Sequence, residues 1–181
     1  MRTMVSPPSW GLLAEFPSAA EVLRAAQEAY AAGYRRMDAY SPFPVHGLAE
    51  AVGMNYTRLP MLILAGGITG GLTGFFMQYF AMAVHYPLVI GGKPLNSWPQ
   101  FIPVTFELTI LFAAFCAVFG MLAFNGLPQP YHPVFNVEKF KLASRDAFFL
   151  CIESSDPKFD PRDTRRFLQS LRATEVSDVE P

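Results

Sequence analysis

The sequence predicts a membrane α+β fold, in which a hairpin of two transmembrane helices is inserted into a split, ferredoxin-like cytoplasmic domain. Two long apolar runs, Pro60–Tyr86 and Pro103–Phe124, each supply the roughly 20 residues that a helix needs to cross a bilayer core of about 30 Å. Between residues 59 and 126 the only charged side chains are those of Lys93 and Glu107. On either side of this stretch, the apolar residues follow the pattern of a strand, a helix and a second strand.

The first flank is typical of one βαβ unit. Trp10–Phe16 is a short apolar run consistent with a buried strand. Ser18 and Glu21 have the spacing of a capping box, so a helix is expected over Ala19–Ala32. Tyr34–Tyr40 follows as a second strand. Because the joints on both sides of the helix are short, the two strands are expected to run parallel to each other.

The second flank repeats this order after a proline-rich re-entry segment. Val137–Ser144 is expected to form a short helix, and Ala147–Ile152 is the most strand-like run in the chain. Asp160 followed by Pro161 predicts the start of another helix. Thr174–Val179 is either a last edge strand or a frayed tail. The two flanks together give the βαββαβ order, and neither half alone has enough apolar surface to fold.

The expected boundaries are residues 1–58 for the first half of the α/β domain, 59–86 for the first transmembrane helix, 87–103 for an outer connection, 104–125 for the second transmembrane helix, and 126–181 for the second half of the domain and its tail. Basic residues near the spans predict the orientation. On one side they are Arg58, Lys139, Lys141 and Arg145, whereas the connection holds Lys93 alone. The start of the chain lacks the apolar core of a secretory signal. Both termini are therefore expected in the cytoplasm.

Charge and ligand spacing argue against several classes of function. A formal net charge of −1 gives no electrostatic footprint for nucleic acid. Cys116 and Cys151 offer neither a disulfide framework nor metal spacing. The three histidines, His46, His85 and His132, are expected at depths too different to hold one haem iron, and no CxxCH motif is present. We therefore expect the chain to bind no metal and no redox cofactor of its own.

Five glycines in the first span form the clearest helix-packing pattern. Gly66, Gly70 and Gly74 recur every four residues, with Gly67 and Gly71 on the adjoining line of the same helix. Small residues at this spacing let another backbone approach closely inside a membrane. The partner is either the second span or another subunit, and glycine is also simply tolerated in membrane helices. The second span offers bulky side chains as knobs, namely Phe106, Phe112, Phe115 and Phe119.

His85 and Glu107 are a candidate polar pair at the outer boundary of the membrane. His85 closes the first span and Glu107 opens the second, so both are expected near the same depth. A carboxylate inside a span is a candidate contact for a proton or a quinone headgroup. The alternative is structural, since a negative charge is also favoured in the first turn of a helix.

Three aspartates in SSDPKFDPRD have a superficial likeness to a metal loop. Asp156, Asp160 and Asp163 lack the alternating acid spacing, the central glycine and the closing glutamate of a calcium hand. Turn and helix-cap roles are expected for them instead.

Longer segments are more distinctive than these short patterns. They are WGLLAEF, GYRRMDAYSPFPV, YPLVIGGKPLNSWPQFIPVTFELTILFAA, NGLPQPYHPVFN and FFLCIESSDPKFD. In these segments the chain resembles the ActD subunit family of bacterial alternative complex III, and the match covers nearly the whole chain, missing only the first few residues and the acidic tail. The resemblance implies a two-span accessory subunit, located in the bacterial inner membrane, of a quinol:electron-acceptor oxidoreductase.

The same resemblance implies the cofactors and partners. Haem c, iron–sulfur clusters and quinol would belong to other subunits, and this chain would bind none of them. Its partners would be large multi-span quinol-binding subunits together with multihaem cytochrome c and iron–sulfur subunits. No catalytic residue is implied.

Two other functions remain open from the sequence. In the first, Glu107 and His85 take part directly in quinol deprotonation or in an outward proton path. In the second, the cytoplasmic domain is a ligand-sensing module of a transporter, which rests on the use of ferredoxin-like domains elsewhere.

Overall fold

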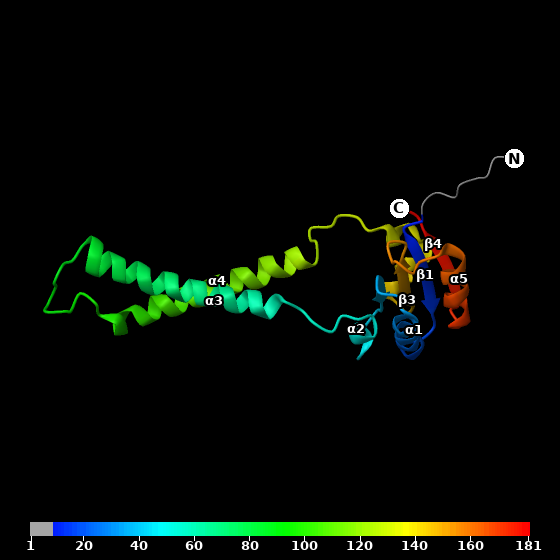
Figure 1. The fold of residues 1–181 in the computed structure, drawn as a ribbon, viewed down its shortest axis with the longest axis horizontal. Helices are drawn as coiled ribbons and strands as arrows, with labels where there is room; N and C mark the ends of the chain where they lie inside the picture. Colours follow the sequence, from blue (N-terminus) through cyan, green and yellow to red (C-terminus); the bar gives the residue numbers. More distant parts are fainter. Residues whose placement is uncertain (1–8) are drawn as a thin grey trace. The chain divides into compact units, whose positions relative to one another are not determined.

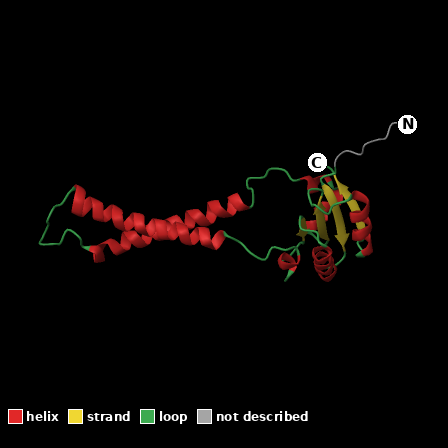
Figure 2. Ribbon diagram, viewed as in Figure 1, coloured by secondary structure: helices red, strands yellow, loops and turns green. Residues whose placement is uncertain are grey.

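The computed structural model describes residues 9–181, which form two compact units (Figure 1). Among the described residues, the α/β unit contains 9–55 together with Pro130–Pro181, and the hairpin unit contains Tyr56–Gln129. Figure 2 shows that the strands all belong to the α/β unit, whereas the hairpin unit is helical. The chain therefore leaves the α/β unit after its first half and returns to complete it.

The α/β unit is built on a four-stranded antiparallel sheet. Its strands are β1 (Gly11–Phe16), β2 (Met37–Tyr40), β3 (Phe148–Glu153) and β4 (Glu175–Val179), in the spatial order β2-β3-β1-β4. Each neighbouring pair is antiparallel, and in the register Cys151 lies opposite both Leu13 and Asp38. Since β1 and β2 are both antiparallel to β3, they run in the same direction, as the βαβ prediction requires.

Two helices and a short helical turn cover one face of this sheet. Helix α1 (Ala19–Ala32) begins where the Ser18 hydroxyl accepts the N–H of Glu21 at 3.3 Å, and α5 (Pro161–Ser170) begins at Asp160. The turn is α2 (Leu48–Ala51). Their apolar sides meet alternate strand residues in one core, whose fully buried members include Leu12, Ala14, Phe16, Val22, Ala26, Leu150, Ile152 and Leu168.

The opposite face of the sheet is covered by the re-entry segment. Here Leu13, Phe149 and Cys151 pack against two 3₁₀ segments, η2 (Pro133–Asn136) and η3 (Glu138–Ser144). The short helix expected over residues 137–144 is therefore of the tighter 3₁₀ type. Both faces of the sheet are buried, which explains why β3 is an almost unbroken apolar run.

Strand β2 starts later than expected, and β4 forms a strand and not a frayed tail. The predicted strand Tyr34–Tyr40 begins only at Met37, because the N–H groups of Arg35 and Arg36 donate to the carboxylate of Asp156 instead of to a neighbouring strand. At the other end of the chain, β4 pairs with β1 along its whole length, so the last segment is a strand.

The hairpin unit holds two antiparallel helices, each long and apolar enough to cross a membrane. Helix α3 (Leu59–Tyr79) continues as the π-helical segment η1 (Phe80–His85), and α4 spans Trp98–Phe124. The second helix begins at Trp98 and not at residue 104 as expected. Pro103 suggested the first turn, but it lies inside the helix, where it removes one backbone donor without ending the helix.

Candidate functional site

Three of the five glycines bring the backbones of α3 and α4 into contact. Gly66, Gly70 and Gly74 are buried, as is Gly67 on the adjoining line, but only the first three lie against the backbone or first side-chain atoms of α4. A Cβ atom at Gly66 would overlap the Sγ of Cys116, and one at Gly70 would overlap the carbonyl oxygen of Leu108. At Gly74 a Cβ atom would lie 3.0 Å from the backbone of α4. Glycine at these positions therefore packs against the second helix of the same chain.

Backbone atoms and non-aromatic side-chain atoms of α4, and not aromatic rings, lie nearest to these glycines. Gly120, which the sequence analysis did not single out, lies so close to α3 that a Cβ atom there would be 2.5 Å from the Cδ2 of Leu62. Of the four phenylalanines expected as knobs, only Phe112 contacts the glycine row, through its backbone and Cβ atom. The other three, Phe106, Phe115 and Phe119, are more than half exposed. The close approach of the two backbones leaves no room for a ring between them.

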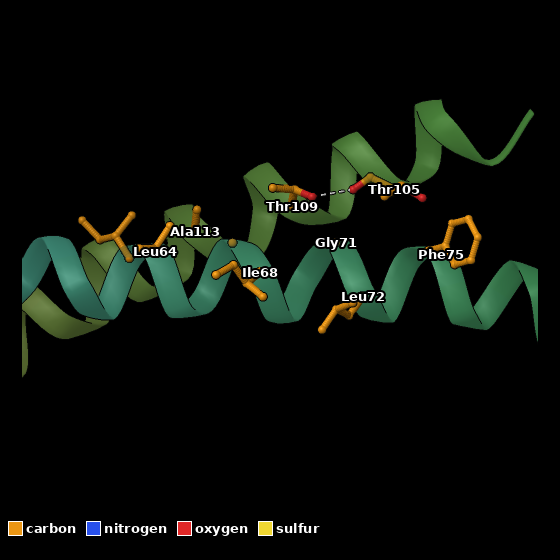
Figure 3. A pocket seen from close by; sticks show the side chains of 10 residues that line it. Leu64, Ile68, Gly71, Leu72, Phe75, Thr105, Thr109 and Ala113 are labelled. Atoms are coloured by element: carbon orange, nitrogen blue, oxygen red, sulfur yellow. Dashed lines mark hydrogen bonds between the residues drawn. The ribbon is translucent and has the colours of Figure 1, made fainter. Parts of the chain in front are cut away.

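The second line of glycines lies beside this contact and lines an open groove. A Cβ atom at Gly67 would have its nearest neighbours at 3.7 Å, whereas one at Gly71 would be 2.8 Å from the Oγ1 of Thr109. The groove between α3 and α4 has a volume of about 600 Å³, and Figure 3 shows the side chains that line it. Its walls are mainly apolar and include Leu64, Ile68, Leu72, Phe75 and Ala113. A surface of this kind suits a hydrocarbon chain or an apolar side chain.

A polar side chain joins the two helices near one end of their contact. The Nε2 of Gln78 donates to the carbonyl oxygen of Phe101 on α4 at 3.0 Å and to that of Gly74 on its own helix at 2.9 Å. Hydrogen bonds between apolar helices contribute modestly to their association, on the order of 0.6 kcal/mol. The bond to Phe101 also shows how the two helices are aligned along their axes, because it places Gln78 of α3 beside Phe101 of α4.

Glu107 lies well inside α4. Because the helix begins at Trp98, Glu107 is about 14 Å along the axis from its start, at about 1.5 Å per residue. A bilayer core takes up about 20 residues of helix, and α4 has 27. Any stretch of that length within α4 includes Glu107. The expected place in the first turn is therefore wrong, and the helix dipole does not account for this carboxylate.

The structure does not bring His85 and Glu107 together. His85 is the last residue of η1, and its ring stacks on Phe80 with 5.8 Å between centroids. From the level of Gln78 and Phe101, His85 lies further toward the connection, whereas Glu107 lies in the other direction. The two residues are therefore about 20 Å apart along the hairpin. Within residues 9–181 no hydrogen bond or ion pair joins them.

The aspartates of the SSDPKFDPRD segment hold turns, as expected. The Oδ2 of Asp156 accepts the N–H groups of Arg35 at 2.6 Å and Arg36 at 2.7 Å, and its Oδ1 accepts that of Lys158 at 2.8 Å. Asp160 caps α5 by accepting the N–H groups of the second and third residues of that helix. Burial raises the pKa of Asp156, but these backbone donors together with the Arg35 charge outweigh it and lower the pKa overall.

A hollow in the α/β unit brings together polar residues that the sequence analysis did not connect. Asp38 and Tyr40 of β2 line it with His132, beside Phe135 and Phe140, and its volume is about 640 Å³. Burial and the charge of Glu153 raise the pKa of Asp38, although His132 opposes them. The only sequence signal was the alternation of Asp38 and Tyr40 along a strand, which places both on the same face. The approach of His132 to these two residues could not be predicted, because it lies more than 90 residues away in sequence.

Comparisons with known proteins give one result that covers nearly the whole chain. The family model described as "Alternative complex III, ActD subunit" matches residues 10–178. A search of curated proteins found no match. The matched range includes both units, so the agreement extends across the hairpin and both halves of the sheet.

Proposed function

Because the chain belongs to the ActD family of alternative complex III subunits, we propose that it is a non-catalytic, structural membrane subunit of a quinol-oxidising electron-transfer complex. In this role it packs against larger subunits that bind quinol. The family match over residues 10–178 is the observation that carries the proposal.

The surface of the hairpin unit supports a place within a membrane assembly. Bulky apolar side chains are exposed along both helices, among them Leu64, Leu72, Phe76, Ile110, Phe115 and Phe119. In water such a surface would drive aggregation, whereas in a bilayer it is compatible with lipid or with neighbouring helices. The mainly polar exposed surface of the α/β unit is compatible with water.

The proposed arrangement places the subunit in the bacterial inner membrane, with both termini in the cytoplasm. The excess of basic residues on the terminal side of the spans supports this orientation. We further infer that the α/β unit is a ferredoxin-like domain split by the hairpin. The spatial strand order β2-β3-β1-β4, with α1 between β1 and β2 and α5 between β3 and β4, supports that inference.

The redox chemistry of the complex is assigned to other chains. Multihaem cytochrome c and iron–sulfur subunits would carry the electrons, and large multi-span subunits would bind the quinol. Among residues 9–181, no three His, Cys, Asp or Glu side chains lie close enough to hold a metal ion. The contribution of this chain is then to anchor and to position its neighbours.

Purification from native membranes tests the proposal. A tag on the full-length chain is expected to recover haem-containing and iron–sulfur subunits, with quinol oxidation activity in the purified sample. Absorption spectra and mass spectrometry of the eluate provide the measurement. Recovery of the chain alone, without colour, would overturn the proposed function.

A second experiment tests the orientation. A single cysteine introduced at Lys93 in a Cys116→Ser, Cys151→Ser background is expected to react with an impermeant maleimide added to the outside of intact cells. A cysteine at the C-terminus is expected to react only after the membrane is opened. The reverse pattern would overturn the proposed topology.

A further inference from the structure

Glu107 lies on the side of α4 that faces away from α3. Residues spaced by three or four positions share one face of a helix, and this rule groups Glu107 with a row of exposed residues. The row, which we call the Glu107 face, comprises Gln100, Pro103, Glu107, Leu111, Ala114 and Val118. The residues that contact the glycines of α3, such as Leu108 and Phe112, lie on the other side of the helix.

The carboxylate of Glu107 has no partner within the described chain. Among residues 9–181 it forms no hydrogen bond and no ion pair, and its side chain is exposed. A bilayer core of about 20 residues includes Glu107 wherever it is placed along α4, and at one extreme Glu107 is the third residue inside it. A carboxylate facing lipid is strongly unfavourable, and acidic side chains in spans face protein or a water-filled cavity.

From this unmet charge we propose that the Glu107 face is the docking surface for a membrane-spanning helix of another subunit, which places an arginine or lysine side chain against Glu107. The inference rests on the proposed function, because it needs a complex with other membrane subunits. It adds to that function the face that is used and the chemistry of the partner.

Charge complementarity argues against a second copy of this chain as the occupant. Between residues 59 and 126 the only lysine or arginine is Lys93, which lies in the connection and outside both helices, and His85 is about 20 Å from Glu107 along the hairpin. A second copy therefore has no basic group to offer at the depth of Glu107. A symmetric contact through this face would also bring two carboxylates together, which repel each other when ionised.

The shape of the Glu107 face fits a helix as partner. Ala114 lies about two turns from Glu107 on the same row, and a small side chain at that spacing allows a neighbouring helix to approach. Gln100 lies about two turns away in the other direction and offers a further hydrogen-bonding group. In contrast, the groove lined by Gly67 and Gly71 is mainly apolar and presents no charge.

The test compares Glu107→Leu and Glu107→Gln with Leu111→Ala, a matched apolar change on the same face. Each variant of the tagged full-length chain is purified from native membranes, and the other subunits are quantified by mass spectrometry. Glu107→Leu is expected to lower their recovery about tenfold or more, because the partner's basic group is left buried and unpaired. Glu107→Gln is expected to lower it less, and Leu111→Ala least.

The same variants are also expressed without the other subunits. Without a partner subunit, Glu107→Leu is expected to insert into membranes at least as well as the wild type, because the change removes a charge from the span. A fall in recovery of the complex then reports loss of the partner contact, whereas normal recovery means that lipid or water surrounds Glu107. A wild-type chain that recovers no other subunit would overturn the proposed function itself. Normal recovery with Glu107→Leu would overturn only the docking surface.

A photo-crosslinking residue at Leu111 identifies the occupant. Adducts with another membrane subunit support the proposal, and sequencing of the adduct is expected to place an arginine or lysine within one or two helical turns of the crosslinked site. Adducts only with a second copy of this chain, or only with lipid, would overturn it. An intact complex with lower turnover in Glu107→Gln would also overturn it, in favour of a proton path.

Discussion

Gly70 lies directly against the carbonyl group of Leu108, so the backbones of α3 and α4 touch at this point. A methyl group on Gly70 would overlap that oxygen and would lie 2.8 Å from the Cβ of Phe112. Since backbone atoms cannot move aside as the end of a side chain can, Gly70→Ala is expected to destabilise the hairpin by about 1–3 kcal/mol. Unfolding of the full-length chain in mixed micelles with increasing sodium dodecyl sulfate provides the measurement.

Gly67→Ala is the matched control on the same helix. The nearest atoms to its new methyl group would be at 3.7 Å, which is ordinary van der Waals contact. The change is therefore expected to leave the free energy of unfolding within about 0.5 kcal/mol of the wild-type value, apart from a gain in helix propensity. Equal effects at Gly67 and Gly70 would contradict the packing described here.

Asp156 joins two turns of the α/β unit that are far apart in sequence. Its carboxylate accepts the N–H groups of Arg35, Arg36 and Lys158, and the residue is only 4% exposed. Asp156→Ala leaves these donors without their charged acceptor and is expected to lower the free energy of unfolding by about 3 kcal/mol. Urea unfolding followed by the fluorescence of Trp10, in a Trp98→Phe background, provides the measurement.

The control for this variant is Asp163→Ala. Asp163 pairs with Arg166 on the surface of α5, where both side chains are about three-quarters exposed. Exposed pairs of this kind contribute little, so a change of about 0.5 kcal/mol or less is expected. If Asp156→Ala were equally mild, the two turns would not depend on the carboxylate.

The contribution of Asp156 is also expected to depend on pH. Burial raises its pKa, but the backbone donors and the Arg35 charge lower the pKa below its ordinary value of 3.8 in the folded protein. The unfolded chain then binds the proton more tightly, so the stabilisation is complete above the unfolded pKa and is lost as the pH falls through the folded pKa. The difference in urea midpoint between wild type and Asp156→Ala should shrink below about pH 4. A constant difference down to pH 2.5 would contradict this assignment.

Features set by neighbouring residues could be predicted from the sequence. The cap of α1 at Ser18 and the Asp160–Pro161 start of α5 depend on contacts within one turn of helix, and both form as expected. The start of β2 could not be predicted in this way. The N–H groups of Arg35 and Arg36, just before β2, donate to the carboxylate of Asp156, which lies far away in sequence.

The candidate site shows the same limit. A glycine row predicts close packing, but which glycines touch the other helix depends on how the two helices are rotated against each other. Pro103 predicts a helix start and therefore places Glu107 in the first turn, whereas the helix begins at Trp98 and Glu107 lies in its third turn. Local signals thus identified the residues, whereas the surroundings of each depended on the fold.

Cys151 is expected to be unreactive in the folded chain. Cys151 is fully buried in β3, and burial, followed by the charges of Asp38 and Glu153, raises the pKa of its thiol. Since the thiolate is the reactive form, N-ethylmaleimide at pH 8 should leave Cys151 unmodified in the folded chain and modify it fully in urea. Peptide mass spectrometry in a Cys116→Ser background gives the answer. Rapid labelling without urea would mean that the sheet opens readily at β3.

The edge strand β4 is held in the sheet partly by the burial of Val179. Val179 is fully buried and packs beside Leu13, although it lies close to the end of the chain. Removing two methyl groups there through Val179→Ala is expected to destabilise the α/β unit by about 1–3 kcal/mol. Asp178→Ala on the same strand serves as the control, since Asp178 is mostly exposed and its pair with Arg165 should contribute at most about 1 kcal/mol. A wild-type urea midpoint for Val179→Ala would mean that the strand is frayed in solution, because only a strand held against β1 can keep this side chain away from water.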